Sequence, residues 1–453
     1  MIRKAVRFVD QRSGTAPLVR KTLRYVFPDH WSFLLGEVAL YCFILLVLTG
    51  IYLTFFFDDS VAQMTYHGSY TPLDGATVSH AYASVLHISL DVKAGLLIRQ
   101  THHWAANVFV AAIVLHVLRI FFTGAFRKPR DLTYLIGVGM LMLALLEGYA
   151  GYSLADDLLS GMGLAIGYSV AMSVPFVGAN LANLIWDGPF PGSSSFWPRL
   201  FIVHVLVLPV LIGGLLALHL VLVASRHHTQ FKRTARETER HVVGIPAFPG
   251  QAPRSIGLML WVFAVLFLLG GLVQINPIWL WGPYHTYLST NGAQPDWYLG
   301  WLIGALRLVP HFDVVIGNYT LIPNPFWGGA LFPMVVFGFL FAWPLIERRW
   351  ISRDYGFHNL LERPRDAPLR TAIGIGVFTW VTMIFVAGGV DRITVLFDVS
   401  YTSVIWVFRF AIWIVPIVFG VIAHRVCVEL QRGEEVERMR KRAEHRAKAM
   451  AES

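Results

Sequence analysis

Eight apolar runs, each long enough to cross a membrane, constrain this 453-residue chain more than any other feature. A hydrocarbon core of about 30 Å needs about 20 helical residues. Only 14% of the residues are charged, against about 25% in soluble domains. The runs lie near residues 32–57, 103–123, 132–154, 200–224, 255–275, 326–346, 370–390 and 402–424. We therefore predict an all-α integral membrane protein with eight transmembrane helices.

The basic residues divide the connecting loops into two groups. Of the 37 Lys and Arg residues, 31 fall in five segments: 1–30, 119–131, 224–254, 347–370 and 424–453. The loops on the opposite side, 58–101, 155–200, 276–325 and 391–401, together hold 11 Asp and no Glu. Because basic loops stay in the cytoplasm, both termini are predicted to be cytoplasmic. Short basic loops at membrane ends also give no reason to expect a nucleic-acid partner.

Four histidines lie in or beside the second and fourth runs, where an unpaired imidazole is costly. His102 and His116 are 14 residues apart, and the histidines of the fourth run, His204 and His219, are 15 apart. At about 100° per residue, each pair projects from one face of its helix, roughly 21–22 Å apart along the axis. Both helices run inward, so His102 should meet His204 near the outer face. His116 should then meet His219 near the cytoplasmic face.

These two pairs predict two bis-histidine haems, one above the other. A single such histidine is equally well explained by a hydrogen bond to a neighbouring carbonyl, but four at matched spacing favour haem. Zinc fits poorly, because it needs four ligands around one point. Arg99, one turn before His102, is placed to contact a haem propionate. His103 points about 100° away from His102, and we interpret it as a supporting or lipid-interface residue.

Glycines in the first and third runs repeat the histidine spacing. The two pairs, each 14 residues apart, are Gly36 with Gly50 and Gly137 with Gly151. Any one of them is explained by close packing of helix backbones. Together with the histidine pairs, they predict room for flat cofactors at two depths.

Nearly the whole chain resembles cytochrome b of the quinol:cytochrome c reductase (bc) complexes. The glycine and histidine pairs carry the resemblance, together with the stretches VPFVGANLANLIWDGPFPG and QPDWYLGWLIGALRLVP. Five further stretches are similar to the actinobacterial branch: HWSFLLGE, RIFFTGAFRKPRD, GYSLADDLLSG, QINPIW and HNLLERPRDAPLRTAIG.

The resemblance implies a di-haem subunit that oxidises quinol, menaquinol in this branch, at the outer side. One electron then goes to a Rieske iron–sulfur partner. The other passes through an outer low-potential haem and an inner high-potential haem to a cytoplasmic-side quinone, contributing to proton translocation. No C-x-x-C-H motif is present for covalent attachment, so two non-covalent b haems are expected. Leu34 stands where b6-type relatives place a cysteine for a third haem.

The resemblance also implies partners in a bacterial plasma membrane. Cys42 and Cys427 alone cannot build an iron–sulfur centre, so a Rieske iron–sulfur subunit is expected beside this chain. A cytochrome c subunit, a second copy of the complex in a homodimer, membrane lipid and a cytochrome c oxidase in a supercomplex are the other expected partners.

A Pro-Glu-Trp-Tyr motif in the family supplies a carboxylate that accepts a quinol proton. The matching residues here are Pro295, Asp296, Trp297 and Tyr298. The resemblance assigns catalysis to Asp296 and Tyr298, and places Gly163 in a short outer helix that covers the same pocket. Taken alone, the motif is also typical of a helix start at a membrane interface.

The inner quinone site is weakly marked, with Trp31, Ser32 and His228 as candidates. His227 and His228 are equally well explained as loop residues that contact lipid headgroups. The family usually has Pro-Trp after G-Y-x-L, where this chain has Ala155, Asp156 and Asp157.

We divide the chain into five segments: a basic arm 1–30, a haem-binding four-helix bundle 31–230, a linker 231–254, C-terminal helices 255–430 with an outer loop 276–325, and a charged tail 431–453. A transporter or channel that relays protons through intramembrane His and Asp is the alternative function. A two-haem anchor of a dehydrogenase is a second alternative, which would need neither PDWY nor eight helices.

Overall fold

The computed structural model describes residues 10–14, 16–290 and 294–451. The rest of the predicted arm, outer loop and tail (1–9, 15, 291–293 and 452–453) lies outside the described residues. Eight helices in the described part are long and apolar enough to span a membrane, which confirms the predicted number. These spans are Trp31–Thr54, Gly95–Phe122, Asp131–Ser153, Phe196–Arg226, Ala247–Leu272, Phe326–Ile351, Pro368–Ala387 and Tyr401–Glu444.

Several spans are built from more than one helical segment. The α-helices of the spans are α3 (Leu34–Thr54), α5 (Gly95–Phe122), α6 (Asp131–Ser153), α9 (Phe196–Ile202), α10 (Leu208–Arg226), α11 (Ala252–Leu272), α14 (Phe332–Ile346), α15 (Pro368–Ala387) and α17 (Tyr401–Ala451). A 3₁₀ turn, η1 (Trp31–Phe33), precedes α3. The π-helical turns within or beside the spans are η3 (Val203–Val207), η4 (Ala247–Gln251), η6 (Phe326–Leu331) and η7 (Glu347–Ile351).

Short elements form the connections between the spans. The short helices are α2 (Ala16–Leu23), α4 (His80–Leu90), α7 (Leu158–Met172), α8 (Gly178–Trp186), α12 (Ile278–Trp281), α13 (Gly300–Leu308) and α16 (Val390–Phe397), with 3₁₀ turns η2 (Thr71–Leu73), η5 (Trp297–Leu299) and η8 (Pro364–Asp366). The antiparallel pairs are β1 (Val26–Phe27) with β5 (Ile245–Pro246), β2 (Gln63–Thr65) with β3 (Thr77–Ser79), and β6 (Val314–Ile316) with β7 (Tyr319–Ile322); β4 (Gln230–Phe231) and β8 (Leu360–Leu361) are parallel.

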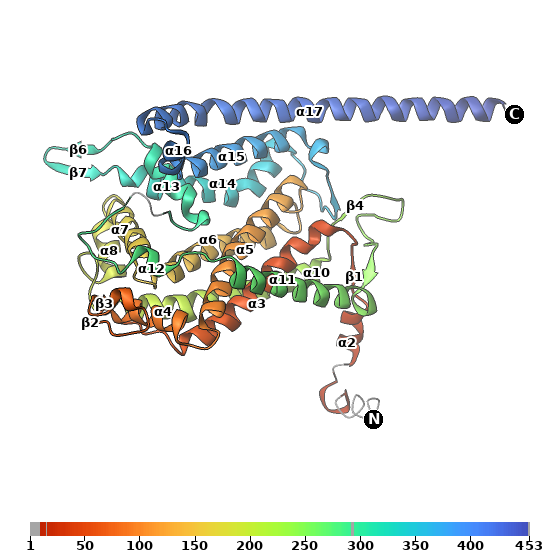
Figure 1. Cartoon of the computed structure of the whole chain (residues 1–453). Helices are drawn as coiled ribbons and strands as arrows, with labels where there is room; N and C mark the ends of the chain where they lie inside the picture. Colours follow the sequence, from red (N-terminus) through yellow and green to blue (C-terminus); the bar gives the residue numbers. More distant parts are fainter. Residues whose placement is uncertain (1–9, 15, 291–293, 452–453) are drawn as a thin grey trace.

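The long helices lie side by side, and both chain ends lie at one end of the molecule, with α2 and β4 (Figure 1). We call this the termini end. The β2–β3 and β6–β7 hairpins, α7 and α8 lie at the other end, which we call the loop end. In the described residues, each strand lies in a segment outside the spans and belongs to a two-stranded sheet.

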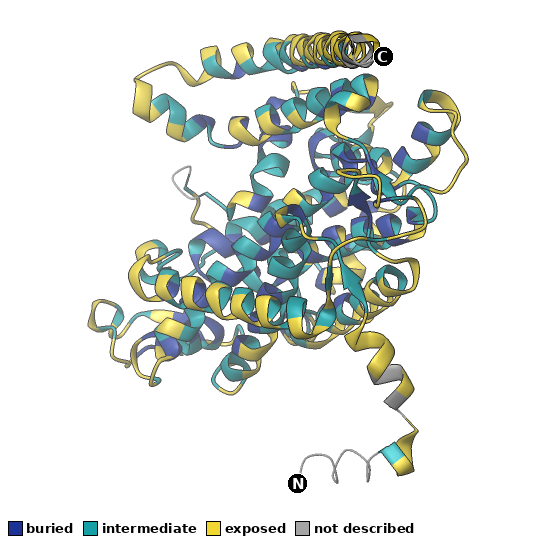
Figure 2. Cartoon of the chain, turned by 90° about the vertical axis from the view of Figure 1, so that its right-hand side faces the viewer, coloured by how far each residue is buried: buried dark blue, intermediate teal, exposed yellow. Residues whose placement is uncertain are grey.

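The first four spans form a bundle, as predicted. Helix α3 packs on α5, α5 contacts α6, and α6 contacts α10, while η3 contacts α3 and closes the ring. Its central layer consists of Cys42, Leu45, Ala105, Phe109, Ala144 and Ile212, and Leu266 of α11 in the fifth span packs against it. Figure 2 shows buried residues gathered among the central helices, whereas the far part of α17 is exposed.

The second span starts at Gly95, earlier than the hydropathy pattern predicted. Polar residues lower the hydropathy here, but the helix continues because they find partners. The Gln100 amide donates to the carbonyl of Ile275 at 2.9 Å, and the Ile275 N–H donates back to Gln100 at 2.9 Å. A buried amide with both groups bonded is tolerated inside a membrane protein.

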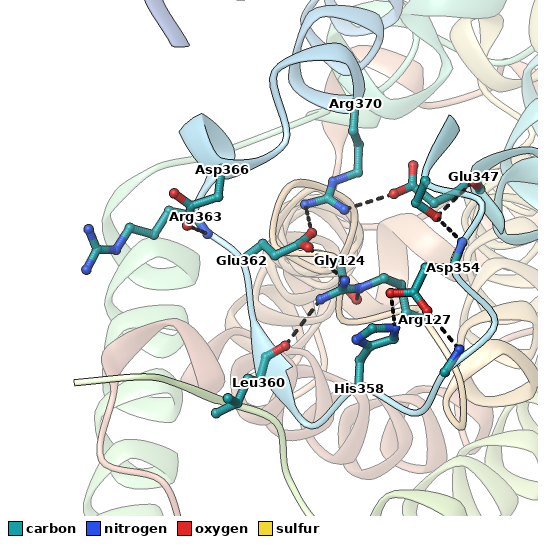
Figure 3. Close-up of polar contacts among 12 residues, drawn as sticks. Gly124, Arg127, Glu347, Asp354, His358, Leu360, Glu362, Arg363, Asp366 and Arg370 are labelled. Atoms are coloured by element: carbon teal, nitrogen blue, oxygen red, sulfur yellow. Dashed lines mark hydrogen bonds and ion pairs between the residues drawn. The ribbon is translucent and has the colours of Figure 1, made fainter. Parts of the chain in front are cut away.

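At the termini end, basic and acidic side chains join the four-helix bundle to the C-terminal helices (Figure 3). Arg370 is 1% exposed, and its guanidinium lies 3.1 Å from a carboxylate oxygen of Glu347 and 2.7 Å from one of Glu362. Arg127, in the loop after α5, pairs with Glu362 at 2.7 Å. The stretches RIFFTGAFRKPRD and HNLLERPRDAPLRTAIG therefore meet in one ion-pair cluster.

Candidate functional site

The four predicted histidines lie at two levels of the bundle. The ring centroids of His102 and His204 are 6.2 Å apart, with the ring planes at 79°. His116 and His219 both line a cavity of about 990 Å³ towards the termini end. The central apolar layer defined above contributes residues from between each pair on the four helices, so it separates the two levels.

A π-helical turn brings the fourth span into phase with the second. His204 lies in η3 (Val203–Val207), where one extra residue is accommodated in a turn. The 15 residues from His204 to His219 therefore rotate like about 14 residues of regular α-helix. This is the spacing of His102 and His116, so both pairs have the same angular offset.

Each predicted glycine faces one of the histidines: Gly36 faces His116, Gly50 faces His102, Gly137 faces His219, and Gly151 faces His204. A Cβ at Gly36 would lie 3.3 Å from the ring of His116, and one at Gly151 would collide with the ring of His204. Side chains at these positions would occupy the space beside the imidazoles. The glycines therefore form cradles at both levels.

One arginine at each level has a buried amino group without a hydrogen-bond partner among the described residues. Arg99 donates from Nε to Ser89 at 3.0 Å, but its Nη2 is buried and unpartnered. Arg119, three residues after His116, lies 4.3 Å above the Phe33 ring and also has a buried, unpartnered Nη2. Arg119 was not singled out from the sequence, although its spacing to His116 mirrors that of Arg99 to His102. These groups, with the glycine cradles, fit two haems and their anionic propionates.

The carboxylate of Asp296 is held by three side chains near the loop end. His103 Nε2 lies 2.8 Å from Oδ2, the Tyr298 hydroxyl donates to Oδ2 at 3.0 Å, and the Asn276 amide donates to Oδ1 at 3.2 Å. The Asp296 side chain is 8% exposed. It precedes η5 but makes no capping hydrogen bond. A helix-start role alone therefore does not explain this residue.

Opposing effects act on the pKa of Asp296. Burial raises the pKa, but the neighbouring His103 and the hydrogen bonds from His103, Tyr298 and Asn276 outweigh it and bring the pKa below the ordinary value. Burial and the nearby carboxylate raise the pKa of Tyr298 well above its ordinary value. The pair is therefore an ionised carboxylate beside a protonated phenol.

The PDWY segment is anchored from both sides. Gln294 donates to Asp391, which also pairs with Arg307 of α13 at 2.8 Å. Pro295 is partly buried, and Trp297 is 40% exposed, so only part of the motif turns inward.

Helix α7 carries Gly163, and its Met162 accepts a hydrogen bond from the Thr290 N–H in the loop before the PDWY segment. A Cβ on Gly163 would lie 2.8 Å from the ring of Tyr152, which donates a hydrogen bond to the Leu159 carbonyl. Asp157 caps α7 in a reciprocal capping box with Ser160. Asp157, one of the residues at which this chain departs from the family, is therefore the N-cap of the helix whose Leu159 carbonyl bonds to Tyr152.

At the termini end, the large cavity also reaches two of the three weak candidates. Trp31 and His228 line the cavity, whereas Ser32 does not line it; its side chain is buried and bonds to His30 at 2.8 Å. Burial lowers the pKa of His228 to about 4, with nearby Arg130 acting in the same direction. His30 was not singled out from the sequence, although it directly precedes Trp31 and Ser32.

A family model described as Cytochrome b(N-terminal)/b6/petB matches residues 107–283. The chain is 45% identical over 426 residues to the cytochrome bc1 complex cytochrome b subunit of Corynebacterium diphtheriae, covering 94% of this chain and 78% of that one. The chain belongs to this family of cytochrome b subunits. The counterpart from Mycobacterium tuberculosis is 45% identical over 427 residues, covering 94% of this chain and 77% of that one.

A chain of a hyperthermophilic respiratory Complex III superposes with a TM-score of 0.68 at 18% identity, over 92% of this chain and 99% of that chain. That likeness confirms the all-helical cytochrome b fold. This member of the family is therefore a multi-pass membrane subunit of the bc1 complex, a quinol–cytochrome c reductase. Membership of the cytochrome b family implies b haems.

Proposed function

We propose that this chain carries electrons from an outer quinol site, through two b haems, to an inner quinone site. The observation that supports this most strongly is that each of four paired histidines faces its own glycine cradle. His102 with His204 would hold the outer haem, and His116 with His219 the inner one. When bound, haem held by two histidines would supply one-electron transfer.

Histidine variants test the pairing. Because each site uses one histidine from each helix, His102→Leu is expected to remove the outer haem and leave the inner one. His219→Leu is expected to do the reverse. The measurement is pyridine haemochrome quantitation with redox difference spectra of the purified complex, compared with the parent. Retention of two haems in either variant would refute the scheme.

Asp296 is proposed as the outer-site proton acceptor. Its carboxylate is ionised and buried, beside a phenol that can exchange a hydrogen bond with substrate. The resemblance to the actinobacterial branch makes menaquinol the proposed substrate. Oxidation of the quinol there would release two protons to the outer side and two electrons, one to the Rieske partner and one towards the outer haem.

Asp296→Asn should lower quinol oxidation by about 10²–10⁴-fold, because an amide nearly keeps the shape but cannot accept a proton. Asp296→Glu is the matched control, since it keeps the acid and should recover turnover. The measurement is steady-state quinol:cytochrome c reductase activity across pH, with both haem spectra as the check on folding. Parent-like turnover in the Asn variant at every pH would exclude this role.

The proposal places the termini end in the cytoplasm and the quinone-reducing site in the large cavity there. Trp31, Ser32 and His228 are its proposed residues, joined now by His30. Among the described residues both cysteines are free and buried, so the iron–sulfur centre belongs on a separate Rieske subunit. A cytochrome c subunit and a homodimeric complex complete the proposed assembly.

A further inference from the structure

The four paired histidines differ in what faces the second ring nitrogen. His102 Nδ1 lies 2.9 Å from the Thr49 hydroxyl. His204 Nδ1 lies 3.0 Å from Oε1 of Glu147, within ion-pair distance but without hydrogen-bond alignment. In the described part of the chain, Nδ1 of His116 and of His219 has no hydrogen-bond partner. A carboxylate therefore accompanies only the outer pair.

Glu147 lies on α6, one turn before Gly151, inside a membrane span. Its Oε2 is buried without a hydrogen-bond partner, and no Lys or Arg forms an ion pair with it within the described residues. A carboxylate at such a place is costly unless positive charge lies nearby. No part of the proposed electron or proton path described so far uses this group.

The inner level offers a contrast in Glu37, which lines the large cavity. Its carboxylate accepts hydrogen bonds from Tyr41, Gln251 and Ser255, so its charge is stabilised by neighbours on α3, η4 and α11. It forms no ion pair with a paired histidine in the described part of the chain. Arg99 at the outer level and Arg119 at the inner level each have a buried amino group, so the arginines do not distinguish the two levels.

We propose that Glu147 lowers the redox potential of the outer haem relative to the inner haem. This inference rests on the proposed ligation by His102 and His204. A haem iron gains one electron on reduction and loses one unit of positive charge, so a nearby carboxylate favours the oxidised form. Glu147 therefore makes electron transfer from the outer to the inner level more favourable.

Potentiometric titration of the purified complex, followed in the haem absorbance bands, tests the proposal. Glu147→Gln is expected to raise the midpoint potential of the outer haem and leave that of the inner haem unchanged. Glu147→Asp keeps the charge and should remain closer to the parent. Glu37→Gln is the matched control, because it removes the same charge at the inner level and should not move the outer potential.

Different failures are distinguishable in this experiment. An unchanged outer potential in Glu147→Gln, or an equal shift of both haems, overturns the role of Glu147. A parent complex without an outer haem overturns the proposed function itself. If the Gln variant purifies without the outer haem, Glu147→Ser is titrated in its place and must show the same upward shift.

Discussion

Asp296 has one methylene fewer than the glutamate of the family motif, and three neighbouring side chains hold its carboxylate. His103 reaches across from α5 to place Nε2 within 2.9 Å of both carboxylate oxygens. Its side chain is 17% exposed and turned towards Asp296, so the lipid-interface interpretation of His103 is wrong and the supporting one fits. His103, which directly follows the proposed haem ligand His102, thus contacts Asp296 of the proposed quinol site.

His103→Leu should move the acid limb of quinol oxidation to higher pH. Without His103, burial dominates and the pKa of Asp296 rises, although Tyr298 and Asn276 still donate and Tyr152 stays nearby. Activity that needs the carboxylate is present above this pKa and is lost as pH falls through it. The measurement is the pH profile of turnover with both haem bands intact. His103→Gln, which keeps a donor, is the control, and an acid limb shared by all three proteins would contradict the argument.

At the scale of elements, local irregularities align the site. The π-helical turn around His204 gives the fourth span the same angular offset as the second. The cluster of Arg127, Glu347, Glu362 and Arg370 joins the loop after α5 to the starts of later elements. Helix α15, which begins at this cluster, packs on both α5 and α17. The cluster therefore links the haem-binding bundle to the C-terminal helices.

Arg370→Met should destabilise the protein by about 3–5 kcal/mol, because two carboxylates lose a buried partner. Arg363→Met is the matched control, since the Arg363–Glu434 pair is half exposed at 3.4 Å and such pairs contribute about 0–1 kcal/mol. Thermal unfolding of the detergent-solubilised complex measures both. Equal losses in the two variants would show that burial of the cluster is not what matters.

At the scale of the whole molecule, both termini lie at one end of the bundle (Figure 1). An even number of spans requires this, whichever way the protein is inserted. The basic loops lie at the same end, so the positive-inside rule supports the proposed cytoplasmic position of that end. The exposed end of α17 is rich in Lys and Arg, so it offers trypsin sites on one side of the membrane only.

Trypsin added to right-side-out vesicles should leave the tail after Arg425 intact, because the proposed orientation places it inside. An epitope at the C-terminus, detected by immunoblot, provides the measurement. Inverted vesicles are the control and should lose the epitope. Its loss from intact right-side-out vesicles would reverse the proposed topology.

The sequence by itself determined the eight spans and the shared faces of the histidine and glycine pairs. Those features follow from hydropathy and the 3.6-residue period, which are properties of neighbouring residues. PDWY was singled out by its resemblance to the family motif. The sequence also predicted which histidines pair. Because the second and fourth spans run in the same direction, the first histidine of one span can only meet the first histidine of the other.

Only the tertiary structure decided what surrounds these residues. His103 and Asp296 are 193 positions apart, and no local period relates them. The proximity of Glu147 to His204 likewise depends on how α6 and the π-helical turn pack together. Hydropathy shows that a polar group is buried, but its partner depends on the packing of distant helices, which no single segment encodes.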